Sequence, residues 1–246
     1  MDVCLHQFLY SHFNEKARWA LACKRLPHRR QTYLPGPHIP KIRRLSGQTR
    51  TPVLTLDGEV VTGSAAIIDR LERDHPEPAL YPGDPALRDE ALALQARFDA
   101  TVGPATRTAL FSVLVHEGGY LTRMFARDAS APARALYRTT FPLARRLIAR
   151  ANGVTDPDNV ARAFEITGQT LDEVAERTAA TGYLCGDSFS VADLTAASLL
   201  APLVVLDHPD MARPLPVPEP MAAFYARWQD HPAIDWVRHQ YAMHRP

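Results

Sequence analysis

The sequence has few cysteines and no long apolar segment. Only three of its 246 residues are cysteine, and Cys4, Cys23 and Cys185 are widely separated. An odd and scattered set of this kind argues against a disulfide framework or a zinc site, and it indicates a reducing compartment. No apolar run reaches the length that crosses a bilayer, and the start of the chain, MDVCLHQFLY, lacks the basic flank and cleavage pattern of a signal peptide. We therefore expect a cytoplasmic globular protein with no membrane segment and no metal.

An excess of charge of either sign is also missing. Lys and Arg together number 28 and Asp and Glu 27, so the formal net charge is +1. This balance gives no reason to expect nucleic acid or an anionic membrane as a partner. The length allows one large domain or two smaller ones, each with a real core.

Strand and helix patterns alternate in the first part of the chain. Asp57-Gly58 separates two apolar runs and is a dipeptide favoured in tight hairpin turns. Ser64 then precedes a helical pattern with Ile67, Ile68 and Leu71 on one side, and it is a good N-cap residue. The expected strands and helices together cover residues 3–10, 15–26, 29–35, 38–47, 51–56, 59–63 and 64–75. Their order, β-α-β-α-β-β-α, predicts an α/β domain with one mixed sheet.

Strand patterns end at a proline-rich connector, residues 76–85. The remaining patterns are helical, and Gly103-Pro104 is expected to kink the first helix because proline has no N–H and crowds the preceding turn. The expected helices cover residues 86–117, 131–151, 156–180, 191–206 and 218–228. We therefore predict an α/β domain over residues 1–76, a linker over 77–86 and an all-α helical bundle domain over 87–246.

Two short patterns have more than one interpretation. Ser11 and Ser64 each stand where a helix is expected to begin, so each is either a plain helix cap or part of an anion site formed with the free N–H groups of the helix start. Pro52 follows Thr51 at a strand start, where the peptide bond is either trans or, because a tertiary amide makes it cheap, cis. Ser190 and Asp193 form a capping box ahead of an apolar run, and that motif is structural.

These motifs together resemble those of the soluble glutathione transferase superfamily, in which a thioredoxin-like domain precedes a helical domain. The chain opens with Ser11-His12-Phe13 followed by Lys16 and Arg18, similar to the family pattern S-P-F-x-x-[KR]-x-R. TPVL places a proline where the family has a cis-proline, a helix-opening serine follows at the family spacing, and GDSFSVADLTAA resembles the buried capping motif of the second domain. The resemblance covers nearly the whole chain.

The resemblance implies a site for glutathione in the first domain. A cis bond at Pro52 would turn the N–H and C=O of Val53 outward to meet a peptide-like ligand. Ser64 would bind the γ-glutamyl carboxylate. Gly63 stands where the family usually carries Glu or Asp, so a side-chain carboxylate for the γ-glutamyl ammonium is missing. The thiol is therefore expected to be glutathione or a related small thiol.

The glycyl carboxylate of such a thiol needs cations opposite Ser64. Arg50 stands where related enzymes carry Gln or Lys, and a guanidinium can pair with a carboxylate through two parallel bonds. His38 and Lys41 match, within a residue, a His and a Lys that some classes use against this carboxylate. Arg50, His38 and Lys41 would form a positive rim, although each alone fits an ordinary surface side chain.

Ser11 aligns with the catalytic residue of the serine-type classes. Its hydroxyl would donate a hydrogen bond to the thiol sulfur and favour the reactive thiolate, helped by the positive end of the first helix. Asn14 and Tyr10 are alternative donors to the sulfur. His12 occupies the usual proline position; it either assists ionisation as a cation or is a solvent-exposed loop residue. Phe13 is expected to pack beneath the site.

The electrophile would occupy an apolar cleft between the domains, next to Tyr10 and His12. Arg107, Phe111 and Tyr120, with Met124, are candidates to line it, although a buried aromatic stripe has the same spacing and a core position is the better interpretation of Phe111. We therefore expect an enzyme that conjugates glutathione to an electrophile and forms a twofold homodimer, with Arg70 and Arg73 free to meet Asp89 and Glu90 of a partner subunit. The alternative is a non-catalytic binding or scaffold protein with the same fold.

Overall fold

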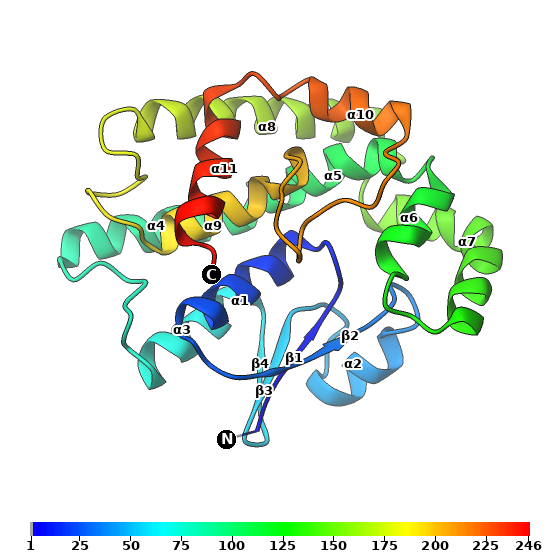
Figure 1. The fold of residues 1–246 in the computed structure, drawn as a ribbon, viewed down its shortest axis with the longest axis horizontal. Coiled ribbons are helices and arrows are strands. Elements are labelled where there is room, and N and C mark those ends of the chain that lie inside the picture. The colour runs from blue at the N-terminus through cyan, green and yellow to red at the C-terminus, as the bar shows by residue number, and fades with distance from the viewer. Residues whose placement is uncertain (1) are drawn as a thin grey trace.

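The computed structural model describes residues 2–246, except for the side chain of Leu143. Its first part has the predicted order of strands and helices and forms the lower half of the molecule in Figure 1. The elements are β1 (Val3–Gln7), α1 (His12–Cys23), β2 (Arg29–Thr32), α2 (Ile39–Ser46), β3 (Val53–Leu56), β4 (Glu59–Thr62) and α3 (Ser64–Asp74). The thioredoxin-like α/β fold predicted for this part is confirmed. Helix α1 begins at His12, three residues before the predicted start, so Ser11 lies directly at its N-terminus.

The four strands form one mixed sheet in the order β2-β1-β3-β4. Strand β2 runs parallel to β1, whereas β3 is antiparallel to β1 and β4. The hairpin predicted at Asp57-Gly58 is present, and both residues have positive φ angles, 48° and 90°. A hairpin turn with two positive φ values matches the twist of the strands that it joins, which explains the choice of this dipeptide.

The core of this domain lies between the sheet and helices α1 and α3. Leu5 and Leu54, on adjacent strands, are fully buried, as are Ile67 and Ile68 of α3 and Trp19 of α1. The alternation in the strands and the apolar stripes of the helices therefore meet on one face of the sheet. Helix α2 contacts the β4 side of the sheet and buries little more than Ile42.

The second part of the chain is helical; in Figure 1 most of it lies above the sheet domain, and α6 and α7 extend down on the right. Its elements are α4 (Pro85–Ala100), α5 (Val102–Leu114), α6 (Gly118–Phe125), α7 (Ala131–Ala151), α8 (Pro157–Thr178), α9 (Val191–Leu200), the 3₁₀ turn η1 (Ala201–Leu203), α10 (Glu219–Ala226) and α11 (Pro232–His244). The predicted helical class is confirmed. Within residues 2–246, no helix is both long enough and apolar enough to span a membrane.

Several predicted helix boundaries are wrong. The single helix expected over residues 86–117, with a kink at Gly103-Pro104, is two helices. The helical backbone is interrupted at Thr101, two residues before the predicted kink, and the Thr101 hydroxyl bonds the carbonyl oxygen of Arg97. Helices α6 and α11 were not predicted. The helix expected to reach residue 206 ends at Leu200 and continues as a 3₁₀ turn. Residues 75–84, between the last helix of the first part and α4, have neither helix nor strand.

Helix α9 is buried along its whole length and packs against α1 and α4. The predicted capping box at its start is present: Asp193 accepts hydrogen bonds from the N–H and the hydroxyl of Ser190, at 2.9 and 3.0 Å. Asp193 also accepts a bond of 2.8 Å from the N–H of Leu184, so it joins the preceding loop to the helix. The box therefore satisfies donors that burial would otherwise leave without partners.

Buried ion pairs join the two parts of the chain. Lys16 of α1 bonds Asp99 of α4 at 2.6 Å. The fully buried Glu15 accepts bonds from Arg18 and from Arg245, both at 2.7 Å. The basic residues of the opening motif therefore stabilise the domain arrangement around α1, where buried charges need partners.

Candidate functional site

The first component of the site is the start of α1. Ser11 is the N-cap residue with extended backbone, and its carbonyl accepts the N–H of Glu15 at 2.8 Å. Its side chain makes no capping hydrogen bond, and within the described residues it has no other hydrogen-bond partner. The hydroxyl is half-buried and lies where the partial positive charge of a 12-residue helix is concentrated. It can therefore donate to an atom of a ligand at the helix start.

Two further segments meet at this helix start. The Thr51–Pro52 peptide bond is cis, as the cis alternative for Pro52 predicted. The Nδ2 of Asn14 in α1 donates to the hydroxyl of Thr51 at 3.1 Å, and the N–H of Gly63 donates to the carbonyl of Pro52 at 3.0 Å. These two bonds tie the starts of α1 and α3 to the cis-proline loop.

The backbone groups available in this loop belong to Thr51 and not to Val53. Val53 is the first residue of β3 and has ladder partners on both sides, His6 on β1 and Thr62 on β4. Among residues 2–246, neither the N–H nor the C=O of Thr51 has a hydrogen-bond partner. The prediction that Val53 offers its peptide groups to a ligand is therefore corrected to Thr51, because Val53 lies inside the sheet and Thr51 precedes it.

The start of α3 differs by one residue from the prediction. Gly63 occupies the N-cap position and Ser64 is the first helical residue. Gly63 has φ 89° and ψ 146°, a backbone conformation that is open almost only to glycine. The glycine in place of the family's acidic residue is thus explained by its backbone. Ser64 is buried, and its hydroxyl has no hydrogen-bond partner among the described residues.

Neither of the two interpretations of His12 from the sequence, an exposed loop residue or a cation that assists ionisation, matches the structure. His12 is the first residue of α1, is 4% exposed, and its Nε2 donates to the carbonyl of Gly103 in α5 at 2.9 Å. Burial, followed by the charges of Arg107 and Arg213, lowers the pKa of His12 to about 3, against the opposing effect of the bond to Gly103. His12 is therefore neutral near pH 7 and cannot assist thiol ionisation as imidazolium.

His38 also has a structural position. Its Nδ1 accepts the N–H of Gly36 at 3.0 Å and its Nε2 donates to the carbonyl of Thr49 at 2.9 Å. Both ring nitrogens are therefore occupied, and burial lowers the pKa of His38, so the ring stays neutral. The predicted contact between His38 and a glycyl carboxylate is corrected: His38 ties the loop before α2 to the segment after it.

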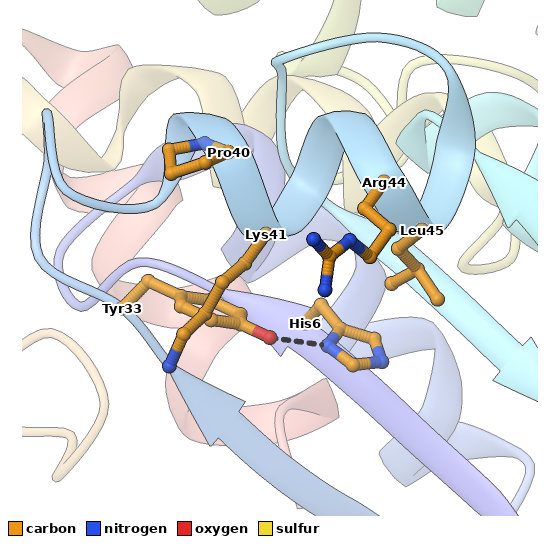
Figure 2. A pocket seen from close by; sticks show the side chains of 6 residues that line it. All are labelled: His6, Tyr33, Pro40, Lys41, Arg44 and Leu45. Carbon is orange, nitrogen blue, oxygen red and sulfur yellow. Dashed lines mark hydrogen bonds between the residues drawn. The ribbon is translucent and has the colours of Figure 1, made fainter.

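Lys41 lines a surface hollow of about 510 Å³ between α2 and the sheet, shown in Figure 2. Neither Ser11 nor Ser64 lines this hollow, so the hollow does not place Lys41 beside the starts of α1 and α3. Its lining residues are His6, Tyr33, Pro40, Lys41, Arg44 and Leu45. Arg50 is exposed, and its charge is close enough to Arg107 to lower the pKa of that residue, after the larger effect of burial.

Tyr10 lies beside two guanidinium groups that the sequence did not indicate. The Nη1 of Arg127 donates to the Tyr10 hydroxyl at 3.0 Å, and the central carbon of Arg127 lies 5.5 Å from the ring centre. The central carbon of Arg213 lies 5.6 Å from the same ring centre. Tyr10 is buried with a φ of 55°. No motif surrounds either arginine, so only the folded chain reveals them.

The predicted electrophile-binding residues are not all equivalent. Tyr120 is 2% exposed and its hydroxyl has no partner among the described residues. Arg107 is half-buried beside His12, with its buried Nε also unpartnered. Phe111 instead stacks on Phe125, with ring centres 6.5 Å apart. Met124 is buried in the core. Tyr120 and Arg107 are therefore the two candidates that keep unused donors near the start of α1.

Comparison with known families identifies this arrangement. Residues 5–79 match the model of the glutathione S-transferase N-terminal domain, and residues 157–231 match that of the C-terminal domain. The chain belongs to the glutathione S-transferase superfamily. The two matched segments fall on the sheet domain and on the helical part, in the order expected for this superfamily.

Individual members of the superfamily are distant from this chain. A probable maleylacetoacetate isomerase of Caenorhabditis elegans is 23% identical over 198 residues, 78% of this chain and 76% of that protein. The structure of the β-etherase LigF from Sphingobium sp. strain SYK-6 has a TM-score of 0.65 and 20% identity, covering 98% of this chain and 100% of that one. A glutathione S-transferase of Methylobacillus flagellatus, solved with glutathione bound, has a TM-score of 0.63 and 17% identity, covering 98% and 95%. These structural similarities show a shared fold.

Proposed function

We propose that the protein is a glutathione-dependent enzyme that activates the thiol at Ser11 and adds it to an electrophile. The observation that carries the proposal is the free Ser11 hydroxyl at the start of α1, next to the cis-proline loop and the start of α3. The relatives named above, an isomerase, a β-etherase and a transferase, support catalysis of the glutathione S-transferase type in general and not one particular reaction.

In this proposal the thiol lies along the cis-proline loop. The unpartnered N–H and C=O of Thr51 would pair with the peptide-like part of the thiol in the manner of an added strand. Ser64 and the N–H groups at the start of α3 would hold one carboxylate, and the cations Arg50 and Arg107 would attract the other. Glutathione satisfies these requirements, and a related small thiol with two carboxylates would satisfy them also.

Activation would depend on a hydrogen bond and on the helix. Ser11 would donate to the sulfur and stabilise the thiolate, together with the free N–H groups in the first turn of α1. The thiolate would then form a bond to the electrophilic atom, whose leaving group departs with the bonding electron pair, and the thiol proton passes to solvent. Because His12 is neutral, the hydroxyl carries a larger share of this stabilisation. Asn14 is already bonded to Thr51.

The test compares Ser11→Ala with Ser11→Thr, which retains a hydroxyl. We expect Ser11→Ala to raise the pKa of the bound thiol, measured by thiolate absorbance, and to lower turnover at neutral pH about tenfold, the effect of one hydrogen bond. Ser11→Thr should recover part of both. If Ser11→Ala kept the wild-type pKa of the bound thiol and the wild-type turnover, Ser11 would have no part in the mechanism. The sulfur contact would then be assigned to Tyr10 or Asn14.

The alternative is a non-catalytic binding or scaffold protein. Retention on immobilised glutathione followed by a spectrophotometric conjugation assay separates the two, since a module of this kind would show no turnover. A disulfide reductase is disfavoured because Ser11 and Asn14 stand where such an enzyme needs a cysteine.

We also propose a cytoplasmic homodimer. Three of the four charged residues expected at the dimer contact also pair within the chain: Arg70 with Glu59 and Asp74, Arg73 with Asp74, and Glu90 with Arg177. These pairs lie at the surface of the chain, and the dimer contact stays a prediction. Sedimentation at micromolar concentration should give about twice the chain mass of 27.4 kDa.

A further inference from the structure

Arg213 is a buried cation without a counterion. Arg213 is 7% exposed, and all three of its guanidinium nitrogens are buried without a hydrogen-bond partner among residues 2–246. It forms no ion pair with any described carboxylate. By contrast, Arg18 and Arg245 are also buried, and both bond Glu15. Burying an unpaired charge is costly, so this position needs a compensating anion.

The unpaired guanidinium lies next to the proposed thiol site. Arg213 belongs to the segment between η1 and α10, which descends to the start of α1 in Figure 1. Its central carbon is 5.6 Å from the ring centre of Tyr10, the residue before Ser11. Its charge also acts on His12, the residue after Ser11. Arg213 therefore lies beside Tyr10, and its charge reaches His12, so it is near both neighbours of the proposed catalytic hydroxyl.

Unused hydroxyl donors accompany Arg213. Tyr120 of α6 and Tyr225 of α10 are 2% and 6% exposed, and neither buried hydroxyl has a partner in the described chain. Burial raises the pKa of Tyr120 to about 12, and the neighbouring Tyr225, Arg213 and Tyr10 also act on it. Tyr120 thus keeps its proton and can donate a hydrogen bond. Tyr120 and Tyr225 belong to α6 and α10, and Arg213 belongs to the segment before α10; Tyr225, Arg213 and Tyr10 are all close enough to Tyr120 to act on its pKa.

We propose that this cluster, Arg213 with Tyr120 and Tyr225, binds the carboxylate of an anionic electrophile beside the thiol at Ser11. A guanidinium matches a carboxylate with two parallel N–H bonds, and the phenol hydroxyls can donate to the remaining lone pairs. Arg107 and Arg127 add positive charge around the same helix start. The inference rests on the proposed function, since it assigns the substrate class of that same site.

Binding is tested first, without glutathione and without turnover. Calorimetric titration with 4-nitrobenzoate and with uncharged 4-nitrobenzamide measures the preference for a carboxylate. We expect wild type to bind the acid at least about tenfold more tightly than the amide, and Arg213→Met to lose that preference. Arg162→Met removes an exposed arginine of α8 and the same single charge, and it should behave as wild type. Equal binding of both compounds by wild type, or an unchanged preference in Arg213→Met, overturns the proposal.

Turnover is tested second, with 4-chloro-3-nitrobenzoate against 4-chloro-3-nitrobenzamide, each normalised to its uncatalysed rate. In both reactions the thiolate sulfur bonds to the ring carbon, the carbon–chlorine bond breaks and chloride leaves with its electron pair. We expect Arg213→Met to lower kcat/KM for the acid at least about tenfold and to leave the amide within about threefold. Weaker glutathione binding with an unchanged acid preference would assign Arg213 to glutathione and overturn the proposal.

The two tests separate the two proposals. Carboxylate binding that depends on Arg213, in a protein that turns over no thiol, would defeat the proposed function and leave the anion site. Removing an unpaired buried charge should also raise the melting temperature of the ligand-free protein, so Arg213→Met is expected to fold. Arg213→Lys, which keeps the charge but not the paired donors, should retain only part of the preference.

Discussion

The Nε2 atom of His12 lies 2.9 Å from the carbonyl oxygen of Gly103, which is 91 residues further along the chain, and both groups are buried. Phe13 touches the same glycine, because a Cβ added to Gly103 would lie 2.4 Å from the Cζ of the Phe13 ring. The first turn of α1 is thus seated on α5 through one hydrogen bond and one close ring contact. The proposed thiol site therefore depends on the packing between the two parts of the chain.

Gly103→Ala should disturb this junction. The added methyl group overlaps the Phe13 ring, so we expect the free energy of unfolding, measured with urea, to fall by about 1–3 kcal/mol, as for other overpacked sites. In a Phe13→Ala background the same substitution should cost much less, since the two positions interact directly. Gly168→Ala is the control: it lies within α8 with open space around it, and should be neutral or stabilising by up to about 1 kcal/mol. Equal effects at Gly103 and Gly168 would contradict the contact.

His12 should make stability depend on pH. The folded-state pKa of about 3 lies below the ordinary value of 6.5, so the unfolded chain binds a proton at a higher pH than the folded one. The contribution of neutral His12 to the free energy of unfolding is fully present above pH 6.5. It is lost as the pH falls toward 3, by about 1.4 kcal/mol per pH unit.

The measurement compares urea unfolding of wild type and His12→Gln at pH 7.5 and 5.0. Wild type should lose about 2 kcal/mol more than the variant over this interval. His239→Gln, at an exposed position of α11, should follow wild type. If His12→Gln lost as much stability as wild type, His12 would not be the buried neutral group described above.

Asp193→Ala should cost more than the loss of an ordinary cap. The substitution leaves the buried N–H groups of Leu184 and Ser190 without an acceptor, so we expect about 3 kcal/mol or more in the free energy of unfolding. Asp156→Ala is a matched cap substitution at the exposed start of α8, and it should cost about 1 kcal/mol. Similar losses for the two variants would mean that water replaces the acceptor at Asp193.

Ser64→Ala should separate binding from activation. In the proposed site its hydroxyl bonds a thiol carboxylate, so we expect glutathione affinity to fall about tenfold in a calorimetric titration. The pKa of the bound thiol should stay near the wild-type value, because the sulfur lies at Ser11. Ser188→Ala, at an exposed loop position, should change neither quantity. Unchanged affinity in Ser64→Ala would make Ser64 a structural residue of the helix start only.

The order of elements and the local motifs could be predicted from the sequence because near neighbours in the chain decide them. The Asp57-Gly58 turn, the Ser190 and Asp193 capping box and the apolar stripe of α3 each depend on a few consecutive residues. The resemblance to a known family likewise pointed to Ser11 through the opening motif and to Pro52 through TPVL. A kink was predicted at Gly103-Pro104, close to the break at Thr101, but the end of one helix and the start of another were not. The helix end at Leu200 was missed because a helical pattern continues across it.

The properties of the site were decided by contacts between distant residues. Sequence patterns left His12 as a cation or an exposed residue, and only its burial against Gly103 makes it neutral. Thr51, and not Val53, keeps free peptide groups because the sheet pairs Val53 with a strand on each side. Arg213 belongs to a segment without a motif, and only the folded chain brings it to Tyr10. A local pattern reports the neighbours of a residue along the chain, whereas its charge and free donors depend on the groups that surround it in space.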